Sequence, residues 1–139
     1  MLKNLHNEHV ALLAMADEIR GWINHEALSD SIALAQCRWR MARTVTQHLA
    51  MEDAHVYGRL AKDPRPEAVA ISNRFKREFS GLLGDINAHI AAWTADAVRA
   101  DWPGYCREMG GLLDGLAARI RFEESVVYPF VFNAEKRAA

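Results

Sequence analysis

The sequence predicts an all-α protein that folds as an antiparallel, up-down-up-down four-helix bundle. Apolar residues recur every three to four positions over most of the chain, and short polar or proline-containing breaks divide it into four stretches. No stretch keeps the alternation of apolar and polar residues that is typical of a strand. Short connections between helices of similar length favour antiparallel neighbours. We expect the 139 residues to form one domain, residues 1–139.

The first two helices are expected at residues 2–25 and 31–61. Asp30 or Ser31 supplies an N-cap signal for the second helix, and the Lys-Asp-Pro-Arg-Pro stretch at 62–66 is a strong breaker after it. One face of the first helix carries Leu5, His9, Leu12, Ala16, Ile19 and Ile23.

The third and fourth helices are expected at residues 66–93 and 101–132. Pro66 suits a first helical turn, and Asp101-Trp102-Pro103 opens the fourth helix. The inward face of the third helix is expected to hold Ile71, Phe75, Phe79, Leu82, Ile86 and Ile90. The apolar stripe of the fourth helix contains Met109, Leu112, Leu116, Ile120 and Val127.

Composition and charge exclude several classes of function. Seventeen basic and eighteen acidic residues leave no basic block that would indicate a nucleic-acid partner. The apolar runs are far shorter than the roughly 18 residues of a membrane span. The N-terminus lacks the profile of a signal peptide, so we expect a cytoplasmic protein. Neither a nucleophile–base pair nor a glycine-rich phosphate loop is visible, which argues against hydrolytic or phosphoryl-transfer chemistry.

Three polar residues in the second helix form the first candidate site. His48, Glu52 and His55 follow one another at offsets of four and three, so they project from one face of a helix. That face is otherwise the apolar stripe Met41, Val45, Leu49 and Val56. Polar groups are costly there unless something satisfies them, and a cation would satisfy all three. The segment is therefore interpreted as an intrahelical metal half-site.

The estimated positions of polar residues along the bundle axis indicate which residues on the other helices could join this half-site. At about 1.5 Å per residue, measured from the end with the N-terminus, several polar residues fall into one layer. The estimates are about 9 Å for His9 and His55, about 14 Å for Glu52, about 20 Å for His48, about 15 Å for Glu123 and about 18 Å for Glu78. His89 lies near 34 Å and is expected to be interfacial or partly exposed.

A weak internal repeat relates the two halves of the chain. Residues 48–57 match residues 119–128, so that Glu52 and Tyr57 correspond to Glu123 and Tyr128. Residues 8–13 match residues 78–83 in the same way. The halves therefore look like duplicated helical hairpins.

Together these motifs resemble the haemerythrin/HHE cation-binding family over essentially the whole chain. They are Glu8-His9, His48-x-x-x-Glu52 and the segment from Glu123 to Tyr128-Pro129. The resemblance implies a four-helix bundle with a non-haem di-iron centre, in which each half gives one histidine from its first helix and an HxxxE pair from its second. It also implies oxygen binding, iron handling, or sensing of oxygen and redox state.

The resemblance is intact in the first half only. His9, His48 and Glu52 match its ligand pattern, but the second half keeps Glu123 alone. Phe79 and Arg119 stand where the other two histidines are expected. The predicted metal ligands are His9, His48, Glu52 and Glu123, with His55 and Glu78 as candidates to complete a second site. Iron, mono- or dinuclear, is the expected cofactor, with zinc or manganese as alternatives.

Two readings of function remain open at this point. In the first, the protein binds a non-haem metal and senses or buffers oxygen, nitric oxide, redox state or metal, with a small diatomic ligand as partner. In the second, the guanidinium of Arg119 neutralises Glu52 and Glu78, and the domain is a metal-free regulatory or interaction module. An enzyme is less favoured, although a peroxide-consuming di-iron protein fits the same family. Neither nucleic acid nor membrane is expected as a partner.

Overall fold

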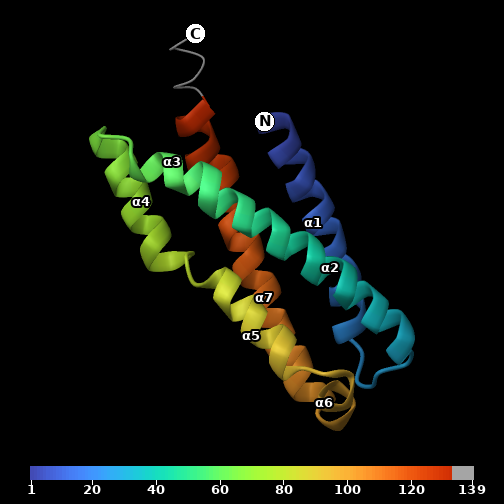
Figure 1. Cartoon of the computed structure of the whole chain (residues 1–139). Coiled ribbons are helices and arrows are strands. Elements are labelled where there is room, and N and C mark those ends of the chain that lie inside the picture. Colours follow the sequence, from blue (N-terminus) through green and yellow to red (C-terminus); the bar gives the residue numbers. More distant parts are fainter. Residues whose placement is uncertain (133–139) are drawn as a thin grey trace.

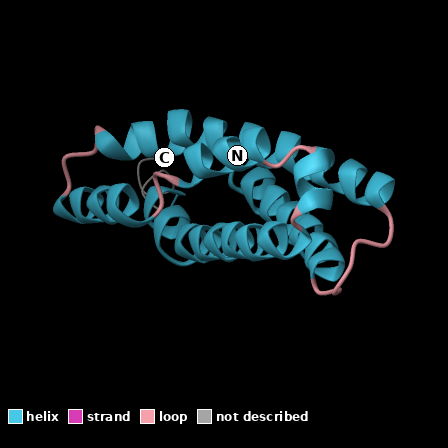
Figure 2. Cartoon of the chain, turned by 90° about the horizontal axis from the view of Figure 1, so that it is seen from below, coloured by secondary structure: helices cyan, strands magenta, loops and turns pink. Residues whose placement is uncertain are grey.

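The computed structural model describes residues 1–132, and this part of the chain is helical without β-strands (Figures 1 and 2). The all-α prediction is therefore confirmed for the described residues. Four long helical arms lie side by side. They are α1 (Leu2–Ile23), α2 (Ser31–Glu52) continued by η1 (Asp53–Tyr57) and α3 (Gly58–Ala61), α4 (Pro66–Glu78) followed by α5 (Leu82–Ala92), and α7 (Trp102–Phe122) continued by η2 (Glu123–Val127) and residues 128–132.

The arms enclose one elongated apolar interior with two parts. α1 and α5 each contact both α2 and α7. The larger part of the core lies between these four helices and includes Leu12, Ile19, Leu34, Leu49 and Leu113, all nearly inaccessible to solvent. The smaller part lies toward the end that holds the N-terminus, α3 and α4. None of the helices in the described chain is long and apolar enough to cross a bilayer.

Helix starts follow the capping signals of the sequence. Asp30 accepts a hydrogen bond from the backbone N–H of Ala33 at the start of α2, as the N-cap signal indicated. Asp101 caps α7 in the same way through the N–H of Gly104. Pro66 occupies the first turn of α4, where its missing N–H leaves no hydrogen bond unmade.

The prediction of one continuous helix at residues 66–93 is wrong. α4 ends at Glu78, α5 begins at Leu82, and Figure 1 shows the bend between them. The N–H groups of Phe79 and Ser80 both donate to the carbonyl of Phe75, so the regular helical ladder stops there. Ser80 and Gly81 have low helix propensity, so interrupting the helix there costs little free energy.

The sequence reading also missed α6 (Ala95–Ala100), a short helix that Thr94 caps.

Two short π-helical segments were not foreseen either. η1 begins directly after Glu52, and η2 begins at Glu123, the residue that the internal repeat aligns with Glu52. In a regular α-helix, side chains five residues apart point about 140° away from each other. A π-turn closes its hydrogen bond between residues five apart and brings such side chains to one side. Tyr57 and Tyr128 are thereby turned toward the same face as the glutamates.

The close approach of Asp101 and Gly104 gives a test of the α7 cap. A Cβ atom at Gly104 would lie 2.1 Å from Asp101 Oδ2, so Gly104→Ala must displace the capping carboxylate. We expect a loss of about 1 kcal/mol in the free energy of unfolding, measured by urea denaturation. Gly111→Ala, on the same helix with nothing within 4 Å of the added atom, should instead stabilise by about 0.5–1 kcal/mol. Equal effects of the two substitutions would contradict this view of the cap.

Candidate metal centre

Four buried side chains from three helical arms converge at one point of the interior. His9 comes from α1, His48 and Glu52 from α2, and Glu123 from the start of η2. One ligand atom from each residue can be chosen so that all four lie within 4.8 Å of one another. Opposite ligand atoms on a first-row metal ion lie up to about 4.4 Å apart, so a closure of a few tenths of an ångström suffices. The arrangement is of the right size for one ion.

The two histidines are held so that Nε2 faces the centre. The Nδ1 atom of His9 lies 2.7 Å from Glu124 Oε1, and that of His48 lies 3.3 Å from Glu8 Oε1. A carboxylate that accepts the Nδ1–H proton fixes the tautomer in which Nε2 carries a lone pair. The rings themselves are 5.0 Å apart between centroids. Both imidazoles are thus oriented as metal ligands by partners outside the centre.

Two of the inward atoms have no hydrogen-bond partner among the described residues. His48 Nε2 lies 3.0 Å from Glu52 Oε1 without making a hydrogen bond of acceptable geometry. Glu123 Oε1 lies 3.0 Å from His9 Nε2 and is also unsatisfied. A buried polar atom without a partner costs about 1–3 kcal/mol, so two of them facing one point require an explanation. A cation at that point would accept a lone pair from each.

The tyrosines of the internal repeat bind the glutamates crosswise. Tyr57 donates its hydroxyl hydrogen to Glu123 Oε2 at 2.7 Å, and Tyr128 donates to Glu52 Oε2. The Tyr128 hydroxyl also lies 3.1 Å from His9 Nε2. Each half of the chain therefore orients the carboxylate of the other half. The π-segments make this possible, because they turn each tyrosine toward the centre.

Arg119 fills the position that corresponds to His48 in the second half. Its guanidinium is fully buried and lies 3.1 Å from Glu123 Oε2, 2.9 Å from Asp53 Oδ1 and 3.5 Å from Glu52 Oε1. The rings of Tyr57 and Phe75 lie at 5.2 and 5.0 Å from its central carbon, within the range of a cation–π contact. A permanent positive charge thus stands beside the two central carboxylates.

Phe75, and not Phe79, is the counterpart of His9 in the second half. His9 stacks on Tyr128, and Phe75 stacks on Tyr57 with ring centroids 3.5 Å apart. Phe79, which the repeat alignment paired with His9, instead stacks on Phe122. The alignment is off by one helical turn: Phe75 lies within α4, whereas Phe79 is the residue at which α4 ends.

Three other histidine or glutamate positions differ from expectation. His55 lies in η1 with its side chain exposed, because the π-turn rotates it away from the face of His48. Glu78 pairs with Arg74 at the surface of α4 and does not reach Arg119. We therefore leave both residues out of the ligand set. His89, expected to be interfacial or partly exposed, is buried and lies between helices, outside the group of four.

The charges of the centre shift the pKa values of its groups in opposite directions. Burial raises the pKa of Glu52. Burial acts the same way on Glu123, but His9, Arg119 and Tyr57 outweigh it and lower its pKa. Burial disfavours the charged form of His9 and His48, yet the neighbouring carboxylates prevail and raise both pKa values. Without a cation, protons thus compensate the negative charge of the centre.

Sequence reasoning missed several residues around the ligands. Glu8, Asp53 and Glu124 lie next to predicted ligands in the chain and hold His48, Arg119 and His9. Tyr57 and Tyr128 could have been found from the repeat, since a tyrosine follows the glutamate by five residues in both halves. Phe75 was expected on the inward face of the third helix and is buried there, but the repeat alignment did not identify it as the counterpart of His9.

A helical bundle with buried histidines and glutamates on three arms is the architecture of a cation-binding helical domain. The family model described as Hemerythrin HHE cation binding domain matches residues 1–131, and the chain belongs to this family. The family resemblance expected from the motifs is thereby confirmed. Neither a curated protein nor a solved structure matches the chain.

The raised histidine pKa values predict how pH affects the metal-free protein. Unfolded histidines release their protons near pH 6.5, whereas folded His9 and His48 keep theirs to higher pH. Their stabilising contribution is complete below pH 6.5 and is lost as pH rises through the folded-state values. Urea denaturation of chelator-treated protein should show stability falling as the pH rises above about 6.5, with a shallower slope for His48→Gln. A rise in stability above this pH would contradict the assignment.

Replacement of Arg119 tests its role as a fixed counter-charge. Arg119→Met removes the guanidinium but keeps much of the side-chain volume, leaving Glu52 and Glu123 uncompensated. Loss of one partner of a buried ion pair costs about 3–5 kcal/mol, and we expect this loss in the unfolding free energy of metal-free protein. Arg121→Met, at an exposed position of the same helix, should change stability by less than about 0.5 kcal/mol. If the two variants are equally stable, Arg119 does not compensate the carboxylates.

Proposed function

We propose that the domain, an up-down-up-down four-helix bundle, binds one non-haem metal ion, iron, through His9, His48, Glu52 and Glu123. Its function would be to sense or buffer oxygen, nitric oxide, redox state or metal. The observation that carries the proposal is the pair of unsatisfied buried atoms, His48 Nε2 and Glu123 Oε1, directed at one point. The contacts of each arm with two neighbours and the short connections support the bundle topology.

The charge balance favours one ion over two. Glu52, Glu123 and Asp53 carry three negative charges when ionised, and Arg119 carries one positive charge among them. One divalent cation neutralises the remaining two negative charges. A second divalent cation would leave surplus positive charge in a buried place, where it is costly. Arg119 and Phe75 also remove the imidazoles that a second ion would need.

The donor set favours iron among the common metals. Two imidazoles and two carboxylates suit iron(II), manganese(II) or zinc, and histidine–carboxylate sites with an open position are typical of non-haem iron. When bound, ferrous iron supplies an open coordination position that takes up oxygen or nitric oxide. The chain contributes the rest: Glu8 and Glu124 fix the imidazole tautomers, and the tyrosine hydroxyls hold the outer oxygen of each carboxylate.

The position of the two glutamates could couple ligand binding at the centre to a change in helix conformation. Glu52 immediately precedes η1, and Glu123 is the first residue of η2. π-turns are less regular than α-helix and are common at functional sites. A change in how the carboxylates are held would therefore act on the two helix segments that contain Tyr57 and Tyr128. In a sensor, a change at the metal centre would thus be transmitted to η1 and η2 and to the helix ends that follow them.

A metal-free regulatory or interaction module is the second candidate function. It is favoured by Arg119, which already contacts Glu52 and Glu123 and provides a permanent counter-charge. In that case the protonated histidines supply the remaining positive charge. The two candidates differ in metal content and agree on the fold.

Metal analysis separates the two candidates. Protein produced without a histidine tag in iron-supplemented medium should contain about one iron per chain, and His48→Gln should lose it because Nε2 is a ligand. His55→Gln is the matched control, since His55 lies three residues after Glu52, is exposed and does not belong to the group of four. Circular dichroism of each variant checks that it is folded.

Three outcomes decide the proposal. About one ion in the parent and the His55 variant, with loss in His48→Gln, supports the single-ion centre. Less than about 0.2 ion per chain in the parent supports the metal-free module, and two ions per chain would contradict the charge argument. For the sensing role, the absorbance spectrum of the iron-loaded parent should change on exposure to nitric oxide, and an unchanged spectrum would contradict that role.

A further inference from the structure

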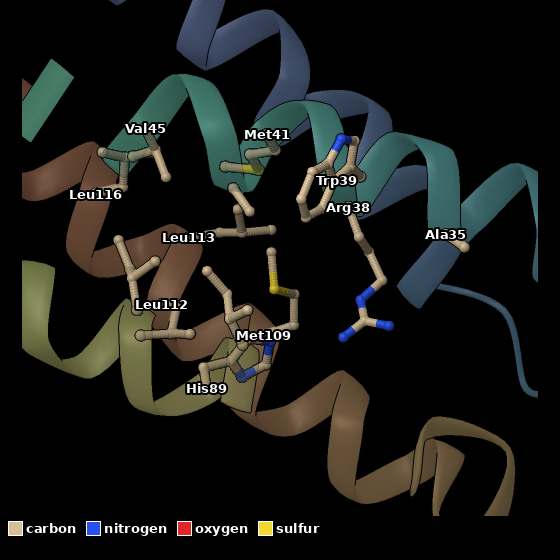
Figure 3. Close-up of a pocket in the computed structure, with 13 residues that line it drawn as sticks. Ala35, Arg38, Trp39, Met41, Val45, His89, Met109, Leu112, Leu113 and Leu116 are labelled. Atoms are coloured by element: carbon tan, nitrogen blue, oxygen red, sulfur yellow. The ribbon is translucent and has the colours of Figure 1, made fainter. Parts of the chain in front are cut away.

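A second feature of the interior, a cavity that is partly open to solvent, lies away from the metal centre. A cavity of about 180 Å³ opens between α2, α5 and α7 (Figure 3). Its walls are largely apolar, as Figure 3 shows for Met41, Val45, Met109, Leu112, Leu113 and Leu116. Val45 and Leu116 come three residues before His48 and Arg119, so the cavity lies next to the metal layer without sharing a ligand.

One wall of this apolar cavity carries a buried imidazole with a free nitrogen. His89 is 7 % exposed and lines the cavity. Its Nδ1 atom lies 2.6 Å from Glu108 Oε2, whereas Nε2 has no hydrogen-bond partner among the described residues. Burial lowers the pKa of His89 despite Glu108, so the ring is neutral at pH 7. With its proton on Nδ1 donated to Glu108, Nε2 is an acceptor without a donor.

Arg38 and Trp93 are already engaged, whereas the buried hydroxyl of Tyr105, which does not line the cavity, has no hydrogen-bond partner among the described residues. Arg38 donates to the carbonyl of Trp93 at 2.5 Å, and its guanidinium lies over the ring of Tyr105. A carboxylate on a ligand would have to compete for this arginine. Trp93 donates its indole N–H to Glu108. The cavity therefore offers apolar walls and one acceptor, and it offers no free cation among the residues that line it.

We propose that this cavity binds a small neutral aromatic compound with one hydrogen-bond donor, such as an indole or a phenol, whose N–H or O–H donates to His89 Nε2. The size agrees: an apolar cavity of about 150 Å³ in another protein binds benzene, so about 180 Å³ holds a single or fused ring. The chemistry agrees too, because a bound donor would satisfy a buried acceptor that otherwise costs free energy. Trp39, a largely exposed lining residue, lies beside the cavity where a ligand can alter its fluorescence.

Titration of the purified full chain with indole and with 1-methylindole tests the proposal. The two probes have nearly the same apolar surface, but only indole has an N–H donor. Isothermal titration calorimetry should give saturable indole binding at one site, with 1-methylindole weaker by about 5-fold or more, the factor expected for one hydrogen bond of about 1 kcal/mol.

Three cavity variants and one control locate the site. His89→Leu should remove the preference for indole, because the acceptor is gone, while His89→Gln, whose amide oxygen accepts, should keep part of it. Ala42→Phe, which places a ring in the cavity, should abolish binding of both probes. His25→Leu, at an exposed position, should bind both probes as the parent does. Circular dichroism establishes that each variant is folded.

The outcomes are independent of the metal centre. Equal affinity for the two probes, or an indole preference that survives His89→Leu, would overturn the role of His89. No saturable binding by the parent up to the solubility limit of indole, or binding unaffected by Ala42→Phe in folded protein, would overturn the site itself. Metal content does not enter the result, because none of the residues that line the cavity is one of the four proposed ligands.

Discussion

The structure depends on how two buried carboxylates are compensated. Glu52 and Glu123 are both inaccessible to water and face the same point, so they cannot both be ionised unless positive charge is supplied nearby. Arg119 supplies one charge permanently. The rest must come from protons on the histidines or from a cation. The tyrosines and histidines around the centre contact the carboxylate groups of Glu52 and Glu123 and hold them in place, and the π-turns position the tyrosines.

The two halves of the chain share a plan but differ in what they place at the centre. Each half contributes one central glutamate, one π-segment and one tyrosine that binds the glutamate of the other half. The first half adds His9 and His48, and the second half has Phe75 and Arg119 in their places. The guanidinium of Arg119 thus stands in the second half at the position that His48 occupies in the first. The two halves therefore place different groups at the centre, and the proposed ligands lie mostly in the first half.

Much of this could be predicted from the sequence, and the failures have local causes. Periodicity and capping signals were sufficient for the long helices, since Asp30, Pro66 and Asp101 act locally. The layer of polar side chains followed from the rise per residue, because His9, His48 and Glu52 lie on regular helices. The expectations for His55 and Phe79 differ from the structure where the helices are irregular: His55 lies in a π-turn, and Phe79 stands where α4 ends. The end of α4 has only a weak signal in Ser80 and Gly81, and the π-turn was not recognised from the sequence.

An anomalous-scattering map of crystals grown with iron(II) under anaerobic conditions would test the central claim most directly. The account predicts one peak per chain, bounded by the Nε2 atoms of His9 and His48 and by oxygens of Glu52 and Glu123, with the guanidinium of Arg119 still in contact with Glu123. Two peaks, or one peak at the place of the guanidinium, would contradict the compensation of these carboxylates by one cation and one arginine.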